Sequence, residues 1–175
     1  MSGVKIEEIR PKISYQKYLG PDWEAEYERP GSIVSNHQCW LDIMMHMYRQ
    51  PPSHVSKAAV KKVPFVGHIA TEVGCLFIDR GDKGQKKDMI TQIAERQKHC
   101  EEGLYPPLIL YPEGGTSNGH QLLQFKKGAF AGLRSIQPIL FKYKSDYFEL
   151  ECCVINFFAH TILAATIFGA TVEVK

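Results

Sequence analysis

A chain of 175 residues with 44% hydrophobic residues is long enough to bury one core of ordinary size and too short for two well-developed domains. Its 21 basic and 19 acidic residues give a net charge of +2, and without an arginine-rich tract this does not indicate a nucleic-acid-binding protein. The five cysteines show neither CxxC nor Cys/His metal spacing, so we expect no metal site, no disulfide framework and a reducing compartment.

The order of strand-like and helix-like stretches predicts an α/β protein with a mixed sheet layered with helices. Residues 1–30 are polar and interrupted by prolines and glycines, so we expect them to form an arm around a domain of residues 31–175. The strands are expected at 31–36, 52–60, 75–80, 107–112 and 136–143. The helices are expected at 39–49, near 58–62 (where the second strand leads into it), at 65–73 and at 86–103.

Two of these stretches give detailed local predictions. The helix at 86–103 has a charged face that we expect to be solvated, and Gly103 supplies its stop. The positions at helical spacing on its other face are Met89, Ile90, Ile93, Ala94 and Gln97. Pro138 interrupts an apolar run, which indicates an edge strand or a strand end.

The C-terminal part raises the question of a membrane span, because no charged residue occurs from Cys152 to Val172. This length is sufficient to cross a bilayer. However, several polar residues interrupt the run and no basic cluster flanks it. We favour a helix around 156–168, packed on the core or lying in the membrane interface, followed by a strand at 171–174.

The stretch SNHQCWLD places His37 where a strand gives way to a helix. Asp42 follows, with four residues between the two. Active sites of open α/β sheets collect at such junctions. In the early turns of the helix, the carboxylate of Asp42 can fold back onto one imidazole nitrogen, fix the tautomer and leave the other nitrogen as a proton acceptor. The alternative is a hydrogen-bonded histidine with a structural role.

A nucleophile to accompany this base is missing from the sequence. No GxSxG motif exists, and Ser32 and Ser35 lie in no nucleophile motif. A base without its own nucleophile suits a reaction in which the substrate supplies the attacking hydroxyl and the acyl donor is already activated, as a thioester is.

Three further stretches carry weaker signals when each is taken alone. YPEGGTSNG (111–119) follows a strand with a glycine-rich turn that allows close approach of a ligand. GCLFIDRGD (74–82) ends a strand with Arg80, whose guanidinium suits a phosphate or a surface ion pair. IQPIL (136–140) is an apolar strand without polar chemistry.

In this order, NHQCWLD, GCLFIDR, YPEGGTSNG and IQPIL resemble the four sequence blocks of the glycerolipid acyltransferase family. Members of this family acylate glycerol 3-phosphate or lysophospholipids from acyl-CoA. The resemblance runs from about residue 10 to the last residue, and the stretches 56–80 and 125–130 are similar to the lysophosphatidylcholine and lysophosphatidylethanolamine acyltransferase branch. It implies a glycerol-3-phosphate acyltransferase-like fold. Members of the family extend further at both ends, so we expect this chain to be truncated relative to them.

The resemblance also implies roles for single residues. His37 becomes the general base, Asp42 its orienting partner, and Arg80 a phosphate ligand. Glu113 and Gly114 shape the acceptor pocket; Gly115 stands where the family commonly has threonine, and Thr116 offers a nearby hydroxyl. Lys57 and Lys126 are possible phosphate or headgroup contacts, with a solvated surface as the alternative. Trp40 and Met44, Met45 and Met47 are expected in the core or along an acyl chain.

The resemblance implies acyl-CoA as co-substrate, a lysophospholipid acceptor, contact with a membrane surface and no bound cofactor. The chain is then expected at a membrane, such as the endoplasmic reticulum, facing a reducing compartment. Two alternatives stay open at this stage. One is a lipid-binding module without catalysis on the same fold, and the other is a hydrolase that uses water to cleave the same thioester.

Overall fold

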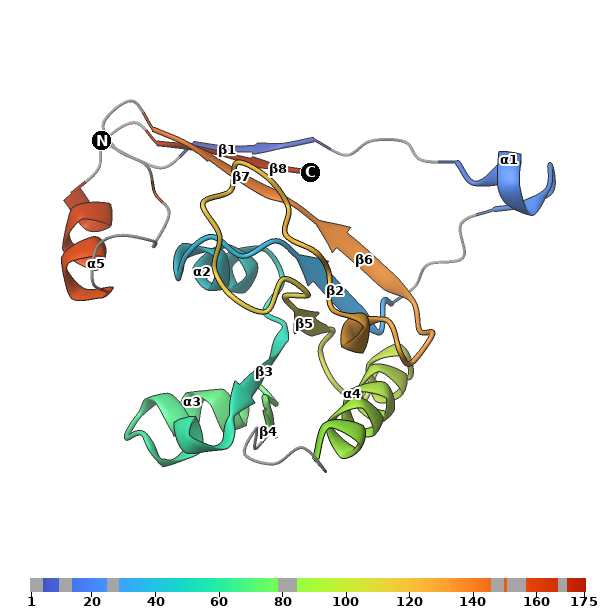
Figure 1. The fold of residues 1–175 in the computed structure, drawn as a ribbon, viewed down its shortest axis with the longest axis horizontal. Helices are drawn as coiled ribbons and strands as arrows, with labels where there is room; N and C mark the ends of the chain where they lie inside the picture. Colours follow the sequence, from blue (N-terminus) through green and yellow to red (C-terminus); the bar gives the residue numbers. More distant parts are fainter. Residues whose placement is uncertain are drawn as a thin grey trace.

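A five-stranded parallel sheet lies at the centre of the computed structural model and a three-stranded sheet lies beside it (Figure 1). The structure describes residues 5–9, 14–24, 29–78, 85–145, 150, 157–166 and 170–175. The larger sheet has the order β4-β3-β5-β2-β6. Its strands are β2 (Ser32–Ser35), β3 (Ser53–Lys57), β4 (Leu76–Ile78), β5 (Leu108–Leu110) and β6 (Ile136–Ile139).

The smaller sheet joins the two ends of the chain. Its strands β1 (Lys5–Glu8), β8 (Thr171–Val174) and β7 (Phe141–Lys144) follow one another in that order. The β1–β8 pair is parallel and the β8–β7 pair is antiparallel. The division into an arm at 1–30 and a domain at 31–175 stays a prediction, and β1 shows that the first segment includes a strand paired with the last one.

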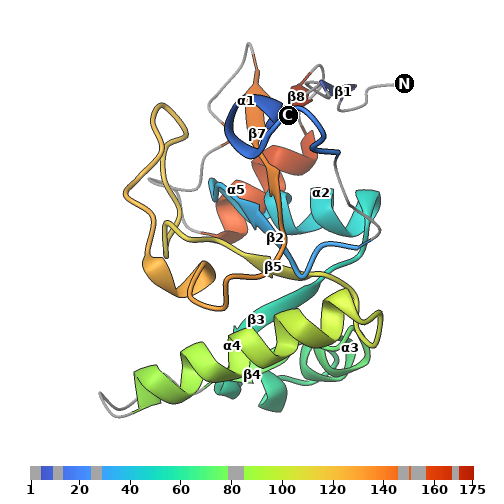
Figure 2. The same cartoon turned by 90° about the vertical axis from the view of Figure 1, so that its right-hand side faces the viewer.

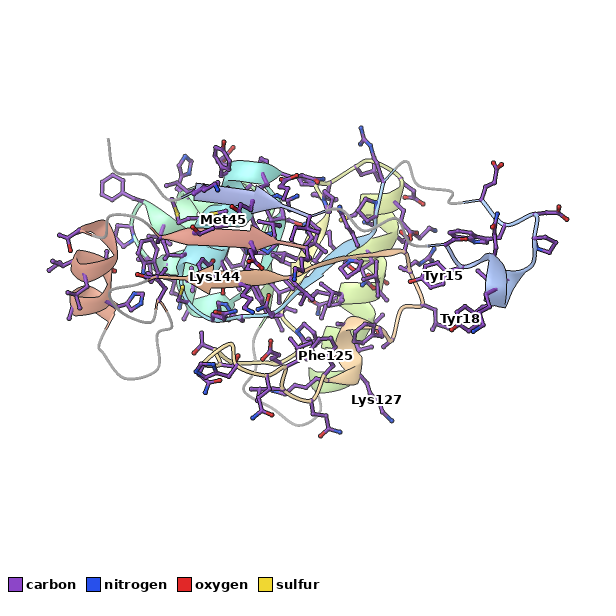
Figure 3. All side chains as sticks on the ribbon, turned by 90° about the horizontal axis from the view of Figure 1, so that it is seen from above. Tyr15, Tyr18, Met45, Phe125, Lys127 and Lys144 are labelled. Carbon is purple, nitrogen blue, oxygen red and sulfur yellow. The ribbon has the colours of Figure 1, made fainter. Side chains whose placement is uncertain are left out.

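The described part of the chain has five α-helices and two short 3-10 turns. They are α1 (Gln16–Leu19), α2 (Leu41–Arg49), α3 (Val66–Glu72), α4 (Gln85–Glu101) and α5 (Phe157–Thr166), with short 3-10 turns η1 (Ala58–Lys62) and η2 (Lys127–Ala129). Figure 2 shows α3 and α4 at one end of the molecule and the smaller sheet at the opposite end. In Figure 3, Tyr15 and Tyr18 lie on the segment around α1, which projects away from both sheets.

Two apolar clusters form the core on opposite faces of the larger sheet. One joins the two sheets and contains Ile33, Ile109, Ile139, Phe141, Val172 and Val174. The other contains Ile78, Ile93, Cys100, Leu108, Leu110 and Ala129, beneath α4 and η2. Strand β5 supplies Ile109 to the first cluster and Leu108 and Leu110 to the second. This alternation is expected for a central parallel strand that is buried on both faces.

The α/β prediction is confirmed, and most of the expected elements are present within a few residues. In α4, Ile93 and Gln97 are buried as expected, whereas Ile90 is exposed. The helix ends at Glu101, and Gly103 takes the left-handed conformation with φ +78°. Pro138 lies in β6, which is an edge strand of the larger sheet, as its missing N–H predicts.

The expected single strand at 136–143 is wrong, because β6 and β7 belong to different sheets. The side chain of Asn36 explains the break. Its Nδ2 donates to the carbonyl of Phe141 and its Oδ1 accepts from the N–H of Phe141, both at 2.9 Å. Since the backbone of Phe141 is bound to this side chain, it cannot continue the ladder with β2, and the chain passes to the second sheet.

The C-terminal part follows the favoured prediction of a helix and then a strand. Helix α5 covers 157–166, and β8 covers 171–174 with Val172 and Val174 buried. The remaining parts of the stretch 152–172, at 152–156 and 167–169, lie outside the described residues. Within the described ranges, no helix combines the length and the apolar character needed to cross a bilayer.

Candidate active site

His37 and Asp42 are in direct contact at the junction between β2 and α2. Nδ1 of His37 lies 2.8 Å from Oδ2 of Asp42, as the spacing in the sequence predicts. The side chain of Asp42 is fully buried, and the side chain of His37 is 20% exposed. The acid is therefore shielded from solvent, while the imidazole remains accessible.

The buried carboxylate of Asp42 has three further donors. The backbone N–H groups of Gln38 and Cys39 donate to Oδ2 at 2.6 and 3.0 Å, and the hydroxyl of Tyr143 donates to Oδ1 at 2.7 Å. Burial and the neighbouring Asp42 carboxylate raise the pKa of Tyr143 far above its ordinary value, so this hydroxyl stays protonated as a donor. These bonds satisfy the buried carboxylate and fix its orientation.

The ring of Tyr111 stacks on the imidazole of His37. The ring centroids are 4.2 Å apart and the planes differ by 22°. Burial raises the pKa of the Tyr111 hydroxyl, and among the described residues this hydroxyl has no hydrogen-bond partner. Tyr111 thus holds the imidazole through its ring face.

The loop at 111–119 fixes the backbone of His37. Oε1 of Glu113 accepts the N–H of His37 at 3.3 Å, and Oε2 accepts the N–H of Leu123 at 3.4 Å. The N–H of Ser117 donates to the carbonyl of His37 at 2.8 Å. The carboxylate of Glu113 is buried in these contacts and does not line the cavity beside the histidine.

Two glycines in this loop lie against side chains that a residue with a Cβ would displace. Gly114 has φ +77°, and the ammonium end of Lys126 occupies the place where a Cβ would lie. Gly119 has φ +70°, and a Cβ there would approach the side chain of Gln38 to 2.6 Å. The loop and the histidine segment are therefore closely fitted to each other.

A cavity of about 1030 Å³ opens beside His37. Its rim includes Gly114, Gly115, Thr116 and Lys126, which the sequence assigns to the same site. The remaining wall is largely apolar and comes from α2, α3, β3, β5 and α4. Its apolar residues include Ile43, Met44, Met47, Val60, Val66, Ile69, Val73, Met89, Ile93 and Ile109. A long apolar group fits such a wall better than a sugar or a nucleotide does.

The structure shows which of the three methionines at 44, 45 and 47 line the cavity and which packs in the core. Met44 and Met47 line the cavity, whereas Met45 packs against the core beneath the smaller sheet (Figure 3). Arg80 lies outside the described residues, and the same holds for the side chain of Lys57, at the end of β3. The roles of both stay predictions.

Two residues of the site were not identified from the sequence. Tyr111 begins the glycine-rich motif and immediately follows β5, and its closeness to His37 follows only once β5 is known to lie beside β2. Tyr143 belongs to the smaller sheet and lies 101 positions from Asp42 in the chain. No local pattern in the sequence predicts that contact.

Comparison with known proteins identifies a family for this chain. The family model described as Acyltransferase matches residues 6–142. A lysophospholipid acyltransferase of Arabidopsis thaliana is 39% identical over 139 residues, and a lysophosphatidylcholine acyltransferase of Drosophila melanogaster is 28% identical over 120 residues. The matches cover 78% and 69% of this chain, but only 35% and 22% of the two relatives.

The fold is also that of a solved relative. A 1-acyl-sn-glycerophosphate acyltransferase of Thermotoga maritima matches with a TM-score of 0.55 at 14% identity. The match covers 98% of this chain and 60% of that protein. The family model over residues 6–142 covers more than half of the chain and shows that the chain belongs to the Acyltransferase family.

Proposed function

We propose that this chain transfers a fatty acyl group from acyl-CoA to the free hydroxyl of a lysophospholipid. The observation that carries the proposal is the contact between His37 and a fully buried Asp42 at the wall of a large apolar cavity. The chain spans about a third or less of the two curated relatives named above. These relatives are a lysophospholipid acyltransferase and a lysophosphatidylcholine acyltransferase, which supports a lysophospholipid acceptor.

The proposed reaction is a direct transfer. Because Nδ1 of His37 is bound to Asp42, the other ring nitrogen accepts the proton of the acceptor hydroxyl as its oxygen attacks the thioester carbonyl. The new C–O bond forms, the C–S bond breaks, and the proton passes from the imidazolium to the departing CoA thiolate. Asp42 stabilises the imidazolium in between, and no protein side chain becomes acylated.

The cavity supplies the binding surfaces for this reaction. Its apolar walls take the acyl chain, and the rim at 114–116 receives the polar part of the substrates. Lys126 lies at this rim, and we propose that it contacts a phosphate together with Arg80 and Lys57. Glu113 supports the site by holding the backbone of His37.

The proposal implies work at a membrane surface, because a lysolipid and a long acyl chain both partition into bilayers. The endoplasmic reticulum, with the site facing a reducing compartment, is the location we propose. The described Cys75 and Cys100 are free thiols, which is compatible with such a compartment. Acyl-CoA acts as co-substrate, and no bound cofactor enters the reaction.

The test is an assay with acyl-CoA in detergent micelles, with and without a panel of lysolipids. Transfer to a lysolipid supports the proposal. CoA release without acceptor identifies a thioester hydrolase, and neither product identifies a lipid-binding module. His37→Ala is expected to lower the transfer rate by about 10² to 10⁴-fold while the chain still folds, as judged by circular dichroism. His99→Ala, a change on α4 that is not part of the cavity wall, is the matched control.

Arg80→Ala tests the phosphate contact separately. We expect it to raise the lysolipid concentration needed for half-maximal rate and to leave the acyl-CoA dependence nearly unchanged. An unaltered lysolipid dependence would exclude Arg80 from the acceptor site.

A further inference from the structure

Four apolar side chains are exposed around the turn from η1 to α3. We call residues 61–69 the η1–α3 rim. Its exposed apolar residues are Val63, Phe65, Val66 and Ile69. Phe65 is 85% exposed, although a phenylalanine of a soluble domain usually buries most of its ring. A group of this kind beside a binding cavity indicates an interaction surface.

The backbone holds this rim in a defined shape. Phe65 has φ +62°, a conformation that bulky residues rarely adopt and that the surrounding structure must maintain. Gly67 follows two positions later and packs against the carbonyl of Lys61 so closely that a Cβ has no room. The turn therefore directs Phe65 away from the core, in agreement with the 85% exposure of its side chain.

The rim is continuous with the cavity. Val66 and Ile69 are exposed and also line the cavity wall. Ile43 and Met44 do the same from α2, so apolar side chains of two helices run from the surface into the site. Lys61 and Lys62 adjoin these residues and are exposed, which places positive charge next to the apolar surface.

We propose that the η1–α3 rim docks on the surface of a bilayer that contains anionic lipid, with Phe65 inserted among the acyl chains. The combination of exposed apolar groups and flanking lysines is the one that membrane interfaces attract. In this orientation the mouth of the cavity opens toward lipid, and an acyl chain enters along Val66 and Ile69 without crossing water. The benefit to turnover rests on the proposed function, whereas the docking itself does not.

Sedimentation with vesicles tests the docking. The probes are vesicles of phosphatidylcholine alone and vesicles that also contain phosphatidylserine. We expect the chain to bind the anionic vesicles more tightly, and Phe65→Ser to weaken binding to both by about tenfold or more, because burial of the ring is lost. Lys61→Gln with Lys62→Gln should weaken binding to the anionic vesicles alone, by about fivefold for each lysine.

Leu104→Ser is the matched control, because Leu104 is 66% exposed and is not part of the cavity wall. Its binding should equal that of the unmodified chain. Absence of vesicle binding by the unmodified chain, or unchanged binding by Phe65→Ser, would overturn the proposal. So would a Phe65-dependent dimer in size-exclusion chromatography without lipid, since the rim would then be covered by a second copy of the chain.

A second measurement separates docking from the proposed activity. Phe65→Ser should slow transfer to a lysolipid presented in vesicles and leave transfer between water-soluble short-chain substrates unchanged. If the unmodified chain transfers no acyl group in either format, the proposed function fails while vesicle sedimentation still decides the docking. An equal loss in both formats would show that Phe65 supports the fold of the site, and would contradict the docking role.

Discussion

The imidazole of His37 stacks on the ring of Tyr111 with the centroids 4.2 Å apart. Asp42 binds the same imidazole at its edge, through Nδ1. One contact restrains the face of the ring and the other restrains its edge, so the imidazole has little freedom to rotate. The remaining ring nitrogen is thereby left for a substrate in the cavity.

Tyr111→Leu should lower kcat by up to about tenfold, because an aromatic pair contributes about 0.5 to 1.5 kcal/mol beyond buried area. Tyr111→Phe keeps the stacked ring and removes a buried hydroxyl without a partner among the described residues, so it should retain near-normal turnover and at least normal stability. Steady-state kinetics and thermal unfolding of both variants provide the check. Equal kcat values in the two variants would show that the stack does not position His37.

Asp42→Asn should slow turnover far more than it weakens acyl-CoA binding. The amide oxygen can take the place of Oδ2 and still accept from the N–H of Gln38, the N–H of Cys39 and Nδ1 of His37. What is lost is the negative charge that stabilises the imidazolium, together with the acceptor for the Tyr143 hydroxyl at the Oδ1 position. Single-turnover rates, set beside acyl-CoA binding measured by calorimetry, distinguish the two effects, and a normal rate would contradict the proposed role of the acid.

Tyr143→Phe removes the only side-chain hydroxyl that the described structure places on Asp42. A hydrogen bond to a buried charged group typically contributes about 1.5 to 3 kcal/mol, so we expect the free energy of unfolding to fall by that amount. Urea denaturation measures the loss. Tyr48→Phe is the control, since Tyr48 is 76% exposed, and a similar loss there would show that the effect is not specific to Asp42.

Gly114→Ala should destabilise the chain by about 1 to 2 kcal/mol, because a residue with a Cβ is strained at φ +77°. The Cβ would also displace Lys126 from the cavity rim, so the substrate concentration for half-maximal rate should rise. Gly128→Ala is the control, as no atom lies within 4 Å of its added Cβ. Identical stability and kinetics in both variants would count against a close fit between Gly114 and Lys126 at the edge of the cavity.

Acid should destabilise the fold through His46, which is buried, and His54, which is half-buried. Burial lowers the pKa of His46 and of His54 from 6.5 to about 4. Between these pH values the unfolded chain binds more protons than the folded chain, so the free energy of unfolding falls as the pH drops from 6.5 to about 4. The slope is at most about 1.4 kcal/mol per pH unit for each histidine.

Urea denaturation at a series of pH values checks this slope. His46→Phe retains a ring against Phe141 and Tyr111 while removing the titrating group, so its slope should be shallower than that of the unmodified chain. His54→Phe should have a similar effect. A slope that neither replacement changes would assign the acid sensitivity to other groups.

The parts of the site that the sequence predicts are those whose residues are neighbours in the chain. His37 and Asp42 are five positions apart, across the short segment that leads from β2 into α2, so their contact follows from local geometry. The glycine-rich loop was assigned to the site by resemblance, and its residues do line the cavity. The resemblance implied an acceptor contact for Glu113, and the structure has this carboxylate on the backbone of His37.

The features that the sequence does not predict depend on contacts between distant segments. The break between β6 and β7 depends on Asn36, which binds the backbone of Phe141 from 105 positions away. The hydroxyl of Tyr143 reaches Asp42 only because β7 leaves the larger sheet at this point. Periodicity describes which residues a strand buries, but it does not state which sheet the strand joins.

The sheet formed by β1, β8 and β7 links residues 5–8 and 171–174 to Tyr143, whose hydroxyl binds Asp42. Tyr143 lies in the register of β7 opposite Val172 of β8, and β8 in turn pairs with β1. A fusion partner attached beside β1 or β8, or removal of either strand, should therefore disturb the hydrogen bond between Tyr143 and Asp42. A label on this chain is therefore better placed on an exposed loop than beside β1 or β8.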